Sequence, residues 1–430
     1  MGRRCLHKDE GWCPLCIFWR KKMKKPELLA PAGNLDKLKK AFIYGADAVY
    51  IGGEEFSLRV AADNFTIDEI KEGVEFAHNR GGKVYLTANV IPHNNDIDDY
   101  GEYLKLVKDT GIDAVILSDL GMFAVTKEIA PELEIHISTQ ANNVNYKSAR
   151  MWKEMGAKRV ILAREMSLNE ISEIRQRVQP DLELEAFVHG AMCISYSGRC
   201  LLSNYMTARD SNSGNCSHPC RWKYYLMEEQ RPGEYMPVFE NERGTFIYNS
   251  KDLCMIEHID KLIESGLSSF KIEGRVKSEF YVSTVVKAYR QAIDSYFENP
   301  EEYRFDPTLL DELKKVSHRD YTTGFYFGKP GGSEQHYASS SYIREYDMVG
   351  IVKDYNAETK MAEVVQKNRF FKGSKVEFLR PVGKFFTQEI GLILDAEGNE
   401  IQVANRPQST VYVKTEQPVE PDTFLRMERK

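Results

Sequence analysis

The sequence predicts an α/β protein built on a (β/α)8 TIM-like barrel, with a Cys-rich insertion after the seventh strand and a small C-terminal antiparallel β-barrel. Three observations lead to this prediction. Short apolar strands alternate with helical segments from Pro26 onward, five of the eight cysteines fall within 193–254, and short strands separated by turns follow residue 335. Alternating strands and helices are typical of a parallel sheet covered on both faces.

Seven strands are expected before residue 191. Each is dominated by β-branched and aliphatic residues, and each intervening segment is long enough to hold a helix. The clearest helical patterns cover 34–45 and 66–81. The expected strands cover residues 27–33, 48–53, 83–89, 114–119, 134–140, 159–164 and 182–190.

The eighth strand is expected at 268–274, followed by a helix at 281–297. Eight such units fit a (β/α)8 barrel better than a doubly wound sheet. We therefore divide the chain into four parts by residue number. These are a cysteine-containing extension (1–22), the barrel (23–335) with its insertion (191–267), and the C-terminal β-barrel (336–430).

The composition is that of an ordinary globular protein, with 42% hydrophobic and 28% charged residues and a net charge of −6. It argues against a disordered, fibrous or membrane-embedded chain. The N-terminus lacks the apolar stretch of a secretory signal, so we expect a cytoplasmic protein with reduced cysteines. The negative charge argues against a general nucleic-acid coat but allows a local basic surface. Residues 367–375, KNRFFKGSK, could hold an RNA strand or form a solvated hairpin.

Several expected strands end in polar or charged residues. In a barrel these ends meet at one face, where active sites are found. The insertion follows the seventh strand, so it should lie over the same face. The residues at these ends are Asn89, Asp119, Gln140, Arg164, Glu165, His189, Lys271, Glu273 and Arg275.

The clustered cysteines indicate metal or redox chemistry, because disulfides are rare in the cytoplasm. Thiolates bind zinc and iron–sulfur clusters. Six residues separate Cys193 from Cys200, three separate Cys216 from Cys220, and thirty-three separate Cys220 from Cys254. This scattered spacing favours a cluster held by a long loop over a zinc ribbon. The alternative is that these cysteines are small buried hydrophobes.

The same stretch resembles the signature of the collagenase-like peptidase family U32. The likeness runs from about Pro26 to the C-terminus and includes the motifs ELLAPAGN, GADAVYIGG, FKIEGR and EFLRP. The central signature residues are Glu185, Phe187, Gly190, Ala191, Met192, Cys193, Gly198, Arg199, Cys200, Leu202 and Ser203.

Family members with the most similar layout are implicated in making 5-hydroxyuridine at the tRNA wobble position, with prephenate as a required metabolite. Other members hydroxylate a ribosomal RNA cytidine or a ubiquinone precursor without oxygen, and they bind a 4Fe–4S cluster through four cysteines. The resemblance implies Cys193, Cys200, Cys220 and Cys254 as cluster ligands, with Cys216 as the alternative to Cys220. It also implies tRNA and prephenate as partners, and a homologous partner protein is a further candidate.

The catalytic candidates are three arginines and one histidine. Prephenate is a dicarboxylate, and the guanidinium groups of Arg164, Arg199 and Arg275 match carboxylates. Equally, they could form salt bridges with neighbouring glutamates. His189 is either a proton donor or a structural histidine.

Two tyrosines and the N-terminal cysteines have two interpretations each. Tyr196 and Tyr205 either stack on an extruded base or pack beneath the loop. The N-terminal extension is either a disordered tail or a small zinc site. The ligands of that site would be Cys5, His7, Cys13 and Cys16.

Two other function classes are alternatives to RNA hydroxylation. One is a peptidase, although the chain contains neither an HExxH zinc motif nor a GxSxG elbow. A His189–Cys193 pair is the remaining candidate for such chemistry, but a thiolate that binds iron is not free as a nucleophile. The other is a non-catalytic RNA-binding partner of a tRNA-modifying enzyme.

Overall fold

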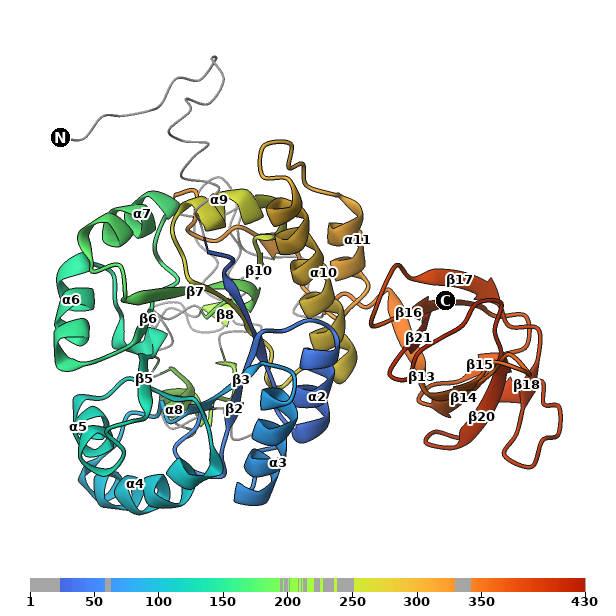
Figure 1. Ribbon diagram of the computed structural model, residues 1–430, viewed down its shortest axis with the longest axis horizontal. Coiled ribbons are helices and arrows are strands. Elements are labelled where there is room, and N and C mark those ends of the chain that lie inside the picture. The colour runs from blue at the N-terminus through green and yellow to red at the C-terminus, as the bar shows by residue number, and fades with distance from the viewer. Residues whose placement is uncertain are drawn as a thin grey trace.

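The computed structural model contains a closed barrel of parallel strands, which confirms the predicted fold class (Figure 1). Neighbouring strands pair in chain order, and β11 pairs with both β1 and β7, which closes the barrel. The structure describes residues 24–58, 63–193, 196, 200, 202–207, 209, 211, 215–219, 225–226, 236–237, 251–328 and 342–429. The barrel strands in these ranges are β1 (Glu27–Pro31), β2 (Ala48–Gly52), β3 (Lys83–Thr87), β4 (Ala114–Leu117), β5 (Glu134–Ile137), β6 (Arg159–Ile161), β7 (Glu183–Ala191) and β11 (Ser269–Ile272).

Helices surround the strands on the outside (Figure 1). Their first turns follow recognisable signals: Thr66 and Glu69 form a capping box, as do Ser167 and Glu170. Burial of one face of each helix against the strands builds the main apolar core. The helices of this layer are α2 (Leu35–Ile43), α3 (Ile67–His78), α4 (Asn94–Val107), α5 (Leu120–Ile129), α6 (Tyr146–Met155), α7 (Leu168–Arg177), α9 (Ile259–Glu264), α10 (Glu279–Glu298) and α11 (Thr308–Lys314).

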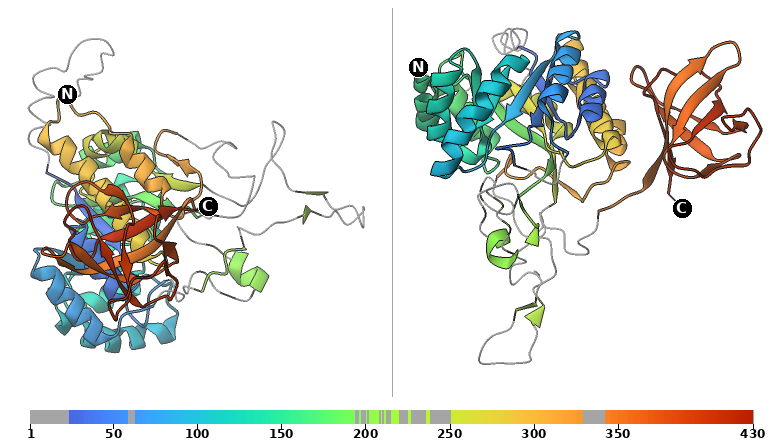
Figure 2. Two further views of the ribbon diagram at one scale, coloured as in Figure 1. Left: turned by 90° about the vertical axis from the view of Figure 1, so that its right-hand side faces the viewer. Right: turned by 90° about the horizontal axis from the view of Figure 1, so that it is seen from below.

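The chain leaves the barrel after β7 and returns at β10 (Asp252–Cys254), which pairs antiparallel with the last residues of β7. β12 (Tyr321–Thr322) then pairs with β10. The described elements between β7 and β10 are α8 (Leu202–Thr207), β8 (Tyr225–Leu226) and β9 (Met236–Pro237). They lie beyond one end of the barrel, in light green in Figure 2. The helical layer resumes at α9, inside the range assigned to the insertion.

The C-terminal residues form a curled antiparallel sheet beside the barrel, in orange and red in Figure 2. It has a separate apolar core that includes Val364, Phe378 and Val413. Its strands, in sheet order, are β17 (Phe386–Glu389), β16 (Lys375–Leu379), β21 (Phe424–Glu428), β13 (Tyr346–Asn356), β14 (Met361–Gln366), β20 (Thr410–Lys414) and β18 (Ile393–Leu394), with β15 (Phe370–Phe371) and β19 (Val403–Ala404) as a further pair.

The two units are joined by buried polar contacts. Arg426 of β21 is fully buried, and its guanidinium contacts Glu312 of α11 at 2.6 Å and Glu377 of β16 at 2.8 Å. On the other side, the Tyr44 hydroxyl donates to the Leu379 carbonyl oxygen at 2.9 Å. The C-terminal sheet is therefore fixed against α2 and α11 by charged and neutral hydrogen bonds.

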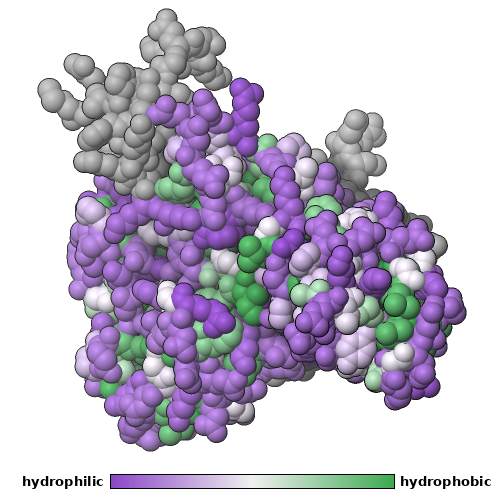
Figure 3. All heavy atoms as spheres, turned by 45° about the vertical axis from the view of Figure 1, so that its right-hand side comes forward, coloured by the Kyte–Doolittle hydropathy of each residue, from purple (hydrophilic) through white to green (hydrophobic). Residues whose placement is uncertain are grey.

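The face drawn in Figure 3 is mainly hydrophilic, with apolar side chains in small scattered groups. The larger apolar side chains are instead gathered in the two cores. Among the helices that the structure describes, none has the length and apolar character needed to cross a bilayer.

Candidate functional site

A pocket opens at the end of the barrel where the strands finish, and we call it the mouth pocket. Side chains of the barrel strands form its walls, and the segment after β7 forms its rim. Six of the polar residues expected at strand ends line it: Asn89, Gln140, Arg164, Lys271, Glu273 and Arg275. Asp119, by contrast, caps α5, where its Oδ1 accepts a hydrogen bond from the Gly121 amide at 2.7 Å.

Three cysteines face the mouth pocket. Cys193, Cys200 and Cys216 belong to its lining, and each is partly exposed. Cys254 lies in β10 directly opposite His189 of β7, at the same end of the barrel. Cys220 lies outside the described residues. The fold therefore brings together cysteines that are far apart in the sequence.

Three thiols in one pocket are the donor type that an iron–sulfur cluster requires. In the described part of the chain, no group of three Cys, His, Asp or Glu side chains is close enough to hold a metal ion. Cys254 is buried, and desolvation raises the pKa of its thiol to about 12. A cationic group would offset this cost of forming the thiolate. The donors thus fit a cluster in type and location but do not form a ready-made cage.

Arg275 lines the mouth pocket and donates hydrogen bonds to three side-chain oxygen atoms. Its Nη1 donates to Ser57 Oγ at 2.6 Å and Thr87 Oγ1 at 3.1 Å, and its Nη2 donates to Asn64 Oδ1 at 3.1 Å. The side chain is only 3% exposed. These hydrogen bonds fix the orientation of the guanidinium, and Arg275 is thereby held as part of the pocket lining.

Arg164 lies across an aromatic ring at the pocket wall. Its Cζ is 4.2 Å from the centroid of the Phe187 ring, and its Nη1 donates to the Ala191 carbonyl oxygen at 3.3 Å. The ring and the carbonyl group hold the guanidinium in place. Of the predicted catalytic arginines, the structure therefore brings Arg164 and Arg275 to one pocket. Arg199 lies outside the described residues.

Lys271 also lines the mouth pocket. The sequence predicted only that it lies at the end of a strand and indicated no role for it. Its Nζ is 3.0 Å from Glu185 Oε1, and both residues are almost fully buried inside the barrel. The signal in the sequence was a lysine within the apolar strand SSFKIEG. Burial of such a residue requires a charged partner.

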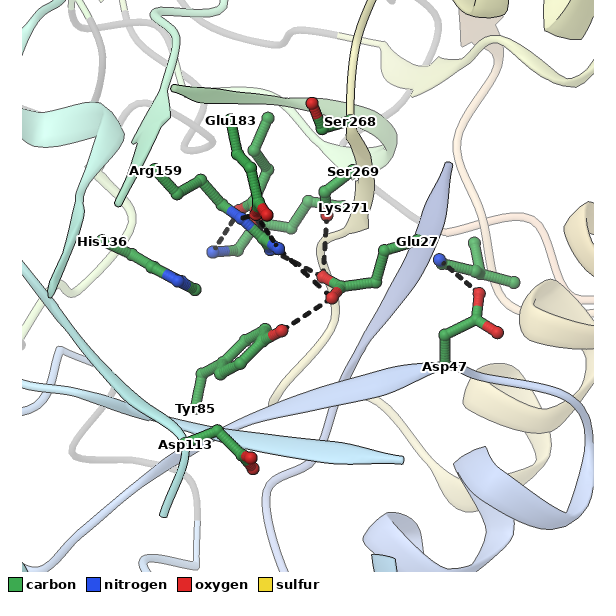
Figure 4. A network of polar contacts seen from close by, with 12 residues as sticks. Glu27, Asp47, Tyr85, Asp113, His136, Arg159, Glu183, Ser268, Ser269 and Lys271 are labelled. Atoms are coloured by element: carbon green, nitrogen blue, oxygen red, sulfur yellow. Dashed lines mark hydrogen bonds and ion pairs between the residues drawn. The ribbon is translucent and has the colours of Figure 1, made fainter. Parts of the chain in front are cut away.

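Beneath Lys271, a network of buried charges fills the barrel floor (Figure 4). The Arg159 guanidinium contacts Glu185 at 2.8 Å and both Glu27 and Glu183 at 2.6 Å. Burial alone would raise the pKa of Glu27, but the attraction of Arg159 outweighs it and lowers the pKa. The Tyr85 hydroxyl also donates to Glu27, at 2.6 Å. The floor is therefore a rigid ionic layer that supports the pocket.

His189 lies in a buried aromatic cluster and is absent from the pocket lining. Its ring packs against those of Tyr281, Tyr289 and Tyr321 at centroid distances of 5.5–6.0 Å. Desolvation and the nearby Lys277 lower the pKa of His189 to about 3. In this position the imidazole is neutral, and it contacts tyrosines of α10 and β12.

The remaining predicted residues are only partly described. Tyr196 is 51% exposed beside the segment that follows β7. The side chain of Tyr205 and the cysteines of the N-terminal extension lie outside the described residues.

Fold and site together define a barrel enzyme: a (β/α)8 barrel with a polar pocket at the carboxyl ends of its strands. The chain belongs to peptidase family U32. The model of that family matches residues 33–336, and the model of the family's C-terminal domain matches residues 344–426.

Two relatives span nearly the whole chain. It is 47% identical over 403 residues to tRNA hydroxylation protein P1 of Bacillus subtilis, covering 94% of this chain and 95% of that protein. It is 40% identical over 447 residues to tRNA hydroxylation protein P of Escherichia coli, covering 94% and 97%. A 23S rRNA 5-hydroxycytidine synthase of Escherichia coli is 34% identical over 311 residues, covering 71% of this chain and 46% of that protein.

Proposed function

We propose that this protein is an RNA-hydroxylating enzyme that forms 5-hydroxyuridine at the tRNA wobble position, without oxygen and with prephenate as co-substrate. The observation that carries the proposal is the mouth pocket. It gathers Cys193, Cys200 and Cys216 with Arg164 and Arg275 in a chain 47% identical to a tRNA hydroxylation protein. Thiols suited to a redox cofactor and cations suited to an anionic metabolite are what such a reaction requires.

We propose a 4Fe–4S cluster as the resident cofactor, held by Cys193, Cys200 and Cys254 with a fourth cysteine. When bound, the cluster supplies one-electron redox chemistry at the pocket rim. The resemblance to the family favours Cys220 as the fourth ligand, and the position of Cys216 in the pocket lining favours Cys216.

The arginines support binding of prephenate in the mouth pocket. A planar guanidinium can donate two parallel hydrogen bonds to one carboxylate, and both arginines are already held in place by protein contacts. Because little side-chain freedom remains to be lost, binding costs less entropy than it would at a mobile surface arginine. Asn89, Ser138 and Gln140 add neutral hydrogen-bonding groups to the same lining.

We propose that the C-terminal sheet provides an RNA-binding surface. Phe371 is 43% exposed, and the Arg369 Cζ lies 5.4 Å from the centroid of its ring. An exposed ring next to a guanidinium suits base stacking combined with phosphate attraction. Lys375, four residues further along the chain, is also exposed and adds positive charge to the same segment.

Peptidase activity is the alternative that the family name raises. It would require His189 to activate Cys193, but His189 packs among buried tyrosines and does not line the pocket that holds Cys193. We therefore favour RNA hydroxylation over proteolysis. A non-catalytic RNA-binding role is separated from catalysis by the experiment below.

The test is mass spectrometry of tRNA nucleosides from a strain that lacks the gene. We expect loss of 5-hydroxyuridine, rescue by the wild-type protein, and no rescue by Cys193→Ala present at equal abundance. Retained 5-hydroxyuridine in the deletion strain would overturn the proposed function. Rescue by Cys193→Ala would instead support a non-catalytic RNA-binding role.

A further inference from the structure

Lys271 is a buried cation with hydrogen-bonding capacity to spare. The side chain lines the mouth pocket, although only 4% of the residue is exposed. Among the described residues, its one charged or hydrogen-bonding partner is Glu185, at 3.0 Å. An ammonium group has three N–H donors, and a buried donor without an acceptor is costly. The pocket is the space in which a ligand can supply the missing acceptors.

Aromatic rings fix the ammonium group of Lys271 at the pocket wall. Its Nζ lies 4.4 Å from the centroid of the Tyr50 ring and 5.4 Å from that of the Phe187 ring. Arg164 lies against the same Phe187 ring, at 4.2 Å. Two cations therefore flank one ring, an arrangement that offers separate sites for the two carboxylates of a small molecule.

Glu185 fixes the position of the Lys271 ammonium group. This glutamate is fully buried, and it contacts Arg159 at 2.8 Å as well as Lys271. Arg159 is in turn anchored by Glu27 and Glu183, as Figure 4 shows. Glu185 is one acceptor beside an ammonium group with three N–H donors, so it positions Lys271 and leaves donors for a ligand.

We propose that the Lys271 ammonium is a substrate contact that binds one carboxylate of the small dicarboxylate in the mouth pocket, and that Glu185 is its positioning residue. The identity of the ligand rests on the proposed function. Arg164, across the Phe187 ring, then receives the second carboxylate. Lys271 thereby gives the pocket its preference for a dicarboxylate over a monocarboxylate.

The test measures binding directly by calorimetry on the purified, anaerobically prepared full-length protein. The probes are prephenate and phenylpyruvate, a keto acid of similar size with one carboxylate. Wild-type protein is expected to prefer prephenate. Lys271→Met should weaken prephenate binding about ten- to a hundredfold, because a charge-assisted hydrogen bond is lost. It should leave phenylpyruvate binding nearly unchanged, so that the preference disappears. Lys271→Arg retains the charge and should recover part of the preference.

Lys158→Met is the matched control. Lys158 reaches the same ionic network only at its edge, where its Nζ lies 3.7 Å from Glu183 Oε1, and it does not line the pocket. This variant should keep the preference for prephenate.

Four outcomes are decisive. Equal prephenate affinity in wild type and Lys271→Met, or a lost preference in the folded control, would overturn the proposed role of Lys271. If Lys271→Met does not fold, Lys271→Gln takes its place. A preference of Lys271→Gln for prephenate over phenylpyruvate equal to that of wild type would then overturn the proposed role. If wild-type protein binds no prephenate at all, the proposed co-substrate is wrong, which is a different failure.

Discussion

The guanidinium of Arg275 occupies the space that a side chain on Gly52 would need. A Cβ built on Gly52 overlaps the Nη2 atom of Arg275 and also comes within 2.5 Å of Ser57 Oγ, one of the groups that hold this arginine. The absence of a side chain at the end of β2 therefore places a buried cation under the mouth pocket.

Gly52→Ala should displace Arg275 from its hydrogen-bonding partners. We expect tRNA hydroxylation to fall by at least about tenfold, with a stability loss of about 1–3 kcal/mol from overpacking. Gly391→Ala is the control, because a Cβ there meets no atom within 4 Å. The measurement is 5-hydroxyuridine content at equal protein abundance. Wild-type content in Gly52→Ala would show that the position of Arg275 does not matter to the reaction.

Arg426 should stabilise the junction between the barrel and the C-terminal sheet. Arg426→Met would remove the fully buried cation between Glu312 and Glu377 and leave Lys315, 2.8 Å from each, as their remaining shared partner. We expect a loss of up to about 3 kcal/mol in unfolding free energy. The matched surface pair is Lys372–Glu400, at 2.6 Å, where Lys372→Met should cost less than about 1 kcal/mol. Urea unfolding of both variants measures the difference. Equal losses would mean that the buried pair adds no more than a surface pair.

Stability should decline as the pH falls below about 6.5, partly because of His136. Burial and the adjacent Arg159 hold the pKa of this histidine well below its ordinary value. Below about pH 6.5 the unfolded chain therefore binds a proton that the native state does not, which costs up to about 1.4 kcal/mol per pH unit. Denaturant unfolding of His136→Gln between about pH 6.5 and 5 should show a shallower slope. An unchanged slope contradicts this assignment, and the slopes above about pH 7 serve as the internal control.

Iron content should separate the two candidates for the fourth ligand. A 4Fe–4S cluster takes four thiolates, and five cysteines are present between residues 193 and 254. We therefore expect Cys193→Ser, Cys200→Ser and Cys254→Ser to lose iron and sulfide. Only one of Cys216→Ser and Cys220→Ser should do so. Retention of iron by both of the last two variants would contradict a four-cysteine site in this segment.

Much of the fold could be predicted from the sequence, because buried parallel strands have a strong apolar signature. The strand pattern placed all eight barrel strands, including β11 beyond the insertion. What the pattern could not predict was β10. A three-residue strand that pairs antiparallel with the end of β7 has too few residues to show a period.

The positions of site residues could be predicted from the sequence where barrel geometry determines them. They could not be predicted where side-chain packing determines them. Residues at strand ends must converge in a closed barrel, so the positions of Arg164 and Arg275 followed from counting strands. The location of His189 did not follow, because the pairing of β7 with β11 shifts register between Phe187 and His189, which breaks the alternation of side chains along β7. Lys271 was missed as a contact because only the fold shows that Glu185 and Arg159 lie beneath it.

The most direct measurement uses extract from a strain that lacks the gene, freed of small metabolites and kept without oxygen. Purified protein is added with or without prephenate, and 5-hydroxyuridine in tRNA is measured by mass spectrometry; the extract supplies any partner protein. Our account predicts that 5-hydroxyuridine forms only when both the protein and prephenate are added. Formation without prephenate, or only after oxygen is admitted, would contradict it.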